Sequence, residues 1–159
     1  MKAVTYIFIA MWLILTTGCQ YDPYAGEMTT EQPKVKDVIG AYQFKEQNIS
    51  QVHINKRGEK ATIVLNADGT YQANNIPNVF DLPDTATCTY ISAKGKWKIS
   101  EIGGVERWSG LKPEWGITLT SIDKNLENIG FTGEKAPYGL MVTFGDPDEG
   151  TVMRFEKVK

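Results

Sequence analysis

Apolar and polar residues alternate in short runs from Val38 to the end of the chain, and turn-forming residues separate these runs. Alternation with a period of two is typical of strands that bury one face. The runs that fit this pattern are 40–44, 51–55, 61–66, 70–74, 85–92, 95–100, 105–108, 117–122, 128–132, 140–144 and 151–158. No window of a dozen residues has sustained helical periodicity. The pattern therefore predicts an all-β domain.

Two hairpins stand out among these runs. Asp68-Gly69 separates residues 61–66 from 70–74, and an Asp-Gly pair is a strong signal for a tight turn between paired strands. Near the end, a Gly/Asp/Pro-rich connector over residues 145–150 separates two further alternating runs. Many short strands with regular turns favour a sandwich or a barrel, and closure removes exposed edges. We expect a single antiparallel β-barrel of about eight to ten strands over residues 38–159.

The chain starts differently. Met1-Lys2 precedes an apolar run from Ala3 to Leu15, interrupted only by Thr5, and the small residues Thr17 and Gly18 precede Cys19. The run is shorter than the roughly 20 residues that a membrane-spanning helix needs, and it fits the apolar region of a signal peptide. The alternatives are an uncleaved anchor or a buried helix. The pattern favours a removable signal over residues 1–18.

This start resembles the signal of bacterial lipoproteins. The resemblance implies cleavage between Gly18 and Cys19 and acylation of Cys19 by a diacylglycerol and a further chain such as palmitate, which would anchor the protein to a membrane. Gln20 after the cysteine resembles an outer-membrane sorting signal, which implies an outer-membrane protein facing the periplasm. Residues 19–37 contain prolines and glycine but little apolar periodicity, so we expect a lipid anchor followed by a flexible tether.

Charge and cysteine content exclude some classes of protein. The chain has 17 basic and 19 acidic residues, and they are interleaved without a basic cluster, so we expect no nucleic-acid partner. Removing the signal with Lys2 leaves 16 basic against 19 acidic residues, a net charge of about −3. If Cys19 carries lipid, Cys88 has no disulfide partner. Cys88 lies in an alternating run, so we expect it to be buried.

Three fragments together resemble small lipocalin-like barrels of bacterial secreted and lipid-anchored proteins. They are Gly40-Ala41-Tyr42, Asp68-Gly69-Thr70-Tyr71 and Gly95-Lys96-Trp97. The stretch from Tyr138 to Phe155 also resembles the ends of uncharacterised bacterial lipoproteins. The resemblance implies a fold and a location, and it implies no mechanism.

Candidate catalytic chemistry is weak. His53 is the only histidine and lies in a strand-like run with polar neighbours, and no nucleophile motif of the Gly-x-Ser-x-Gly or Ser-x-x-Lys kind is present. A pair of carboxylates could act as in hydrolases, but nothing in the sequence selects one. Asp146, Asp148 and Glu149 fail the template of a calcium loop. The group Asp123, Asn125, Glu127 and Asn128 with Glu134 fits the spacing better but lacks the central glycine and the flanking helices, so solvated turns are favoured for both. We therefore expect a non-enzymatic protein with no catalytic residues, no metal and no cofactor.

Binding is the remaining class of function. An eight-stranded barrel either fills its interior with side chains or holds a small molecule. The side chains expected to point inward, as core or as ligand contacts, are Tyr71, Trp97, Phe144, Met153 and Phe155. Trp108 and Trp115 flank a glycine- and proline-containing segment between Gly104 and Gly116, where exposed tryptophan would mark a partner contact. The sequence thus predicts a lipid-anchored module for a small apolar ligand or a protein, or an inhibitor or immunity-type lipoprotein acting through that loop.

Overall fold

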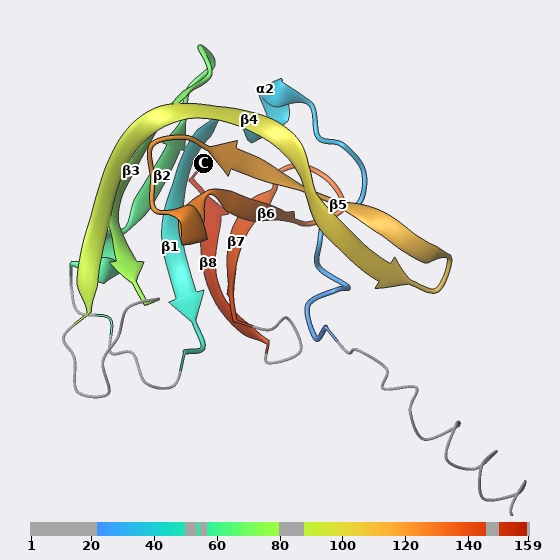
Figure 1. Ribbon diagram of the computed structural model, residues 1–159. Coiled ribbons are helices and arrows are strands. Elements are labelled where there is room, and N and C mark those ends of the chain that lie inside the picture. Colours follow the sequence, from blue (N-terminus) through green and yellow to red (C-terminus); the bar gives the residue numbers. More distant parts are fainter. Residues whose placement is uncertain (1–21, 50–53, 55–56, 80–87, 146–149, 159) are drawn as a thin grey trace, which may run out of the picture.

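A computed structural model describes residues 22–49, 54, 57–79, 88–145 and 150–158. Eight antiparallel strands each pair with the next along the chain, and the last pairs with the first to close a barrel (Figure 1). The strands are β1 (Gly40–Gln47), β2 (Thr62–Leu65), β3 (Thr70–Asn78), β4 (Thr89–Arg107), β5 (Gly110–Leu119), β6 (Asn128–Thr132), β7 (Gly139–Phe144) and β8 (Thr151–Lys157). This up-and-down order is also that of lipocalin barrels. The prediction of an all-β antiparallel barrel is confirmed.

Three short helical segments accompany the barrel. They are α2 (Val35–Val38), η1 (Gly58–Lys60) and η2 (Lys124–Leu126). Val38, at the end of α2, is fully buried in the barrel core, and its carbonyl accepts a hydrogen bond from the Tyr42 hydroxyl at 2.6 Å. The chain therefore enters β1 over one end of the barrel.

The barrel interior contains one cluster of buried side chains contributed by all eight strands. In β2 the inward residues Ile63 and Leu65 are buried, and their pairing partners Ala73 and Tyr71 in β3 are buried too. The period-two pattern of the sequence thus identified the correct faces of this hairpin. Its connection spans residues 66–69, where Gly69 has φ +80°, a conformation that favours glycine.

Strand β4 differs from the expectation. The sequence predicted three separate strands over 85–92, 95–100 and 105–108, whereas one strand runs from Thr89 to Arg107 and arches over the barrel (Figure 1). The prediction was wrong because glycines were taken as strand ends. Gly95 instead lies where a Cβ would be 2.3 Å from the Thr120 carbonyl oxygen, so glycine permits a close backbone approach within the strand.

The predicted loop between Gly104 and Gly116 is also strand. Residues from Gly103 to Arg107 in β4 pair with residues from Gly110 to Glu114 in β5 and form a hairpin that projects beyond the barrel (Figure 1). Pro113 is tolerated because the Trp115 N–H, two residues on, points away from β4 to the Thr29 carbonyl. Successive N–H groups along a strand point to opposite sides, so an N–H at position 113 would point to the same side as that of Trp115, away from β4. Proline at this position therefore removes no hydrogen bond between β4 and β5.

The prediction of a flexible tether over residues 19–37 is wrong for residues 22–37, the part of this range that the structure describes. Residues 22–34, here called the N-terminal segment, lie against the outside of the barrel. Met28 is buried in a second small cluster with Val105, Met141 and Val152. The prediction failed because a segment with few apolar residues was assumed to have nothing to bury. The candidate strand at 51–55 lies outside the described residues except for Ile54.

Candidate interaction site

The end of the β4–β5 hairpin exposes two large apolar side chains. Trp108 is fully exposed (109%) and Leu111 is 71% exposed, within a four-residue stretch, 108–111, here called the hairpin tip. Trp108 and Ser109 form the turn between the paired residues Arg107 and Gly110. Neither Trp108 nor Leu111 lies in a core cluster of the described chain, so burial within the fold does not account for them.

Backbone hydrogen bonds fix the base of this hairpin to the barrel. β5 pairs with β6 only from Gly116 to Thr118, and the N-terminal segment fills the space beyond. Thr29, which is 1% exposed, accepts from the Trp115 N–H at 2.9 Å and donates its own N–H to the Phe131 carbonyl at 3.1 Å. Its hydroxyl donates to the Gly133 carbonyl at 2.7 Å. Thr29 therefore acts as a strand residue between β5 and β6.

Side chains reinforce this attachment close to the tip. Arg107, next to Trp108, donates from its guanidinium to the Met28 carbonyl at 2.9 Å. Val105 is buried against Met28 in the second cluster. Val105 and Arg107 lie on one face of the projecting hairpin, and both hold that face to the N-terminal segment. The direction of the hairpin tip is thereby defined.

A bidentate ion pair anchors the N-terminal segment to β8. The Arg154 guanidinium donates to both carboxylate oxygens of Glu27 at 2.7 and 2.9 Å and lies over the Tyr24 ring at 4.7 Å from its centroid. Glu27 also accepts at its carbonyl from the Gly133 N–H at 2.8 Å. Because Arg154 is only 23% exposed, this pair is shielded better than a fully exposed one.

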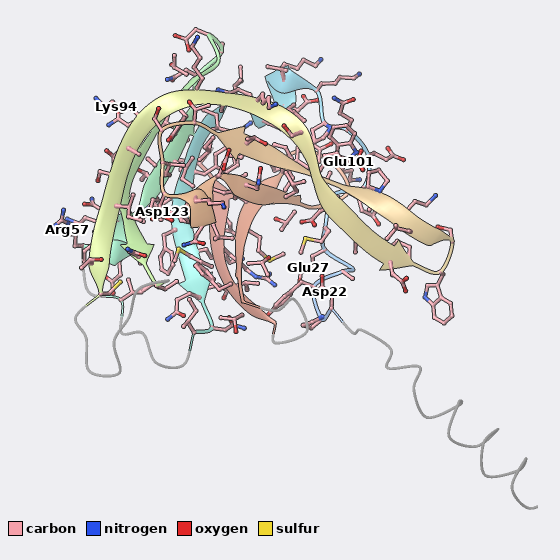
Figure 2. The ribbon with its side chains drawn as sticks, in the orientation of Figure 1. Asp22, Glu27, Arg57, Lys94, Glu101 and Asp123 are labelled. Carbon is pink, nitrogen blue, oxygen red and sulfur yellow. The ribbon has the colours of Figure 1, made fainter. Side chains whose placement is uncertain are left out.

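Glu114 lies at the junction of the hairpin and the N-terminal segment. Burial, with the nearby Asp22 carboxylate as a second cause, raises the pKa of the Glu114 carboxyl above its ordinary value of 4.5. Its oxygens lie over the glycines Gly103 and Gly130, at 3.1 and 2.8 Å from where a Cβ would stand. Figure 2 shows Asp22 and Glu27 below the hairpin and Lys94 toward the opposite end of β4.

A groove of about 620 Å³ lies between the N-terminal segment, the β6–β7 connection and β8. The charged residues that line it are Glu27, Lys45, Glu134, Arg154, Glu156 and Lys157. Each of its cations has a partner within the fold, since Lys45 pairs with Glu156, Arg154 with Glu27, and the Lys157 ammonium donates to the Asp37 carbonyl at 2.7 Å. A ligand would have to compete with these contacts, so the groove is a weaker candidate than the hairpin tip.

The five residues expected to point inward all lie in the core cluster. They are Tyr71, Trp97, Phe144, Met153 and Phe155. The polar atoms of two of them are used within the fold, because the Tyr71 hydroxyl donates to the Thr120 carbonyl at 2.8 Å and the Trp97 indole N–H to the Asn66 carbonyl at 2.9 Å. These contacts orient the rings as core side chains. Their role as ligand contacts stays a prediction.

The two tryptophans expected at a partner surface have different environments. Trp108 is exposed at the hairpin tip, whereas Trp115 is half-buried and packs against the barrel core. The structure therefore does not bring them together on one surface. Leu111, three residues after Trp108, is the second exposed apolar side chain of the hairpin tip and lies over Gly104. The sequence gave no signal of this because the segment was interpreted as a loop.

The structure describes some of the other residues that the sequence singled out. Cys88 is buried as expected, with its thiol 3.3 Å from the Thr89 carbonyl, and burial raises its pKa. The Asp123 carboxylate accepts from the Asn125 N–H at 2.9 Å at the start of η2. Among the described residues no group of three or more His, Cys, Asp or Glu side chains could hold a metal ion. Cys19, His53, Asp146, Asp148 and Glu149 lie outside the described residues.

Comparison with protein-family models, with curated proteins and with solved structures found no match to this chain. Within the described part of the chain, no helix has the length and apolar character needed to cross a bilayer.

Proposed function

We propose that this protein is a lipid-anchored, non-enzymatic module of the bacterial envelope and that the hairpin tip is its contact surface. The observation that carries the proposal is the full exposure of Trp108, with the exposed Leu111 three residues later, at the end of a projecting hairpin. Single exposed apolar residues are common on protein surfaces. Here two occur within four residues at the most projecting part of a hairpin whose base is bonded to the N-terminal segment.

The support of the hairpin favours a binding role over an incidental exposure. A contact surface gains affinity when it is held in its bound conformation before binding, because less conformational entropy is then lost. Thr29, Arg107 and Val105 hold the hairpin in this way. Tryptophan is also among the residues that contribute most to binding energy when they become buried at an interface.

Thiol accessibility in the native envelope tests this proposal. Ser109, the exposed turn residue beside Trp108, is replaced by cysteine in a Cys88→Ala background, and labelling by a maleimide is compared between the envelope fraction and the purified protein. The matched control is Lys94→Cys, an exposed position near the other end of β4. We expect labelling of position 109 in the envelope to fall several-fold relative to position 94. Equal labelling at both positions would refute the contact surface.

A further inference from the structure

We infer that the partner of the hairpin tip is the bilayer that holds the lipid anchor, so that the protein contacts the membrane at two points. The inference rests on the proposed function and names the partner of the same site. Only a short length of chain connects the acylated residue to the folded part. Asp22 is the third residue after Cys19, and an extended chain spans at most about 3.6 Å per residue. Asp22 therefore lies within about 11 Å of the lipidated residue.

The folded chain after Asp22 leads directly to the hairpin. A Cβ at Gly26 would lie 4.0 Å from the Arg107 guanidinium, and that guanidinium donates to the Met28 carbonyl. Arg107 is the residue before Trp108. Figure 1 shows the start of the described chain and the free end of the β4–β5 hairpin toward the same side of the barrel, at the right of the view. The start of the described chain and the hairpin tip therefore lie on the same side of the barrel.

The residues of the tip suit the interface between water and lipid. Tryptophan is enriched at that interface because its ring is apolar and its indole N–H can remain hydrated. Leucine adds apolar area, and residues 106–112 contain Glu106, Arg107 and Lys112, with a net charge of +1. Long cationic side chains can lie along apolar surface and extend their charge to lipid headgroups. Trp108 could also be buried against a protein partner. The bilayer is favoured because the short chain to the lipid anchor keeps it near the hairpin tip.

The consequence is a fixed orientation of the barrel on the membrane. A flexible tether would let the barrel rotate freely, whereas an anchor coupled to the hairpin through the N-terminal segment holds one face toward the bilayer. The opposite end of β4, around Lys94, would then face away from the membrane.

Fluorescence of the full-length lipidated protein in vesicles of phosphatidylethanolamine and phosphatidylglycerol tests this inference. An environment-sensitive dye is attached at Ser109→Cys, which leaves Trp108 intact, or at the control position Lys94→Cys, both in the Cys88→Ala background. We expect the dye at position 109 to shift its emission to shorter wavelength and to be quenched several-fold more by brominated acyl chains than the dye at position 94. In a Trp108→Ala, Leu111→Lys variant the difference should disappear.

Three other outcomes are distinguishable. The dye at position 109 could show water-like emission in vesicles while the thiol at the same position is protected in the native envelope. This result would refute the bilayer as the partner and indicate a protein partner for the tip. Water-like emission in vesicles together with free labelling in the envelope would refute both the bilayer as the partner and the hairpin tip as a contact surface. Quenching that is equal at positions 94 and 109 would show that the barrel has no fixed orientation.

Discussion

The pair between Glu27 and Arg154 gives the sharpest test of how the N-terminal segment is held. Glu27→Gln keeps the shape of the side chain and removes its charge. Charge-assisted bidentate bonds are strong when buried, but these side chains are 44% and 23% exposed, which reduces the expected coupling to about 1 kcal/mol. Arg154→Met also removes the cation over Tyr24, which contributes about 0.5–1 kcal/mol more.

These values predict a loss of about 1 kcal/mol in the free energy of unfolding for Glu27→Gln and about 2 kcal/mol for Arg154→Met. Urea unfolding of the two single variants and the double variant measures the coupling directly. Amide exchange adds a local readout, because the Gly133 and Trp115 N–H groups donate to carbonyls of the N-terminal segment at 2.8 and 2.9 Å. Both amides should exchange faster in the variants.

The control is Glu156→Gln, which breaks the pair with Lys45. That pair is 45% and 63% exposed, so the change should leave the free energy of unfolding the same within the error of the urea assay. A double-mutant coupling near zero for Glu27 and Arg154, with unchanged exchange at Gly133 and Trp115, would refute the reasoning that this pair holds the segment in place.

Three further predictions concern the junction, the arch and the interior. Because the pKa of Glu114 is raised in the fold, the folded state favours the protonated carboxyl, and stability should fall as pH rises above about 4.5. Glu114→Gln should flatten this pH dependence and raise the Tm at neutral pH by about 1–3 °C in thermal melts. A pH profile of stability that is the same in the variant would contradict this. Gly95→Ala should cost at least about 2 kcal/mol, because its Cβ would meet the Thr120 carbonyl oxygen, whereas Gly26→Ala should change stability by less than about 0.5 kcal/mol in the same urea assay; equal effects would contradict this. Native mass spectrometry of the full-length protein should show no co-purifying apolar molecule beyond its own acyl chains; a bound ligand would instead support a carrier.

Sequence patterning was sufficient for the fold class and insufficient for the hairpin. Alternation identified the faces of β2 and β3 because each inward residue there is apolar. In the hairpin the same rule failed, because Gly103, Gly104 and Pro113 suggest a loop unless the direction of each backbone N–H is known. That direction depends on strand pairing, which a single sequence does not contain.

The candidate site was predicted only in part for a related reason. Trp108 was singled out by its residue type, but its exposure depends on the length of the hairpin. Thr29 and Glu27 looked like tether residues because they become buried or paired only against strands that are about a hundred residues away in the sequence. Such long-range partners leave no periodic signal.

Hydrogen–deuterium exchange on the full-length protein in its native envelope membrane tests the contact surface without altering the hairpin. The reference is the Cys19→Ala protein, which we expect to be unanchored and to expose its tip to water. If the hairpin tip is the contact surface, exchange in the anchored protein should slow in peptides covering residues 106–111 and stay unchanged around Lys94. Protection confined to the groove near Glu134, or no protection anywhere, would contradict the proposed function.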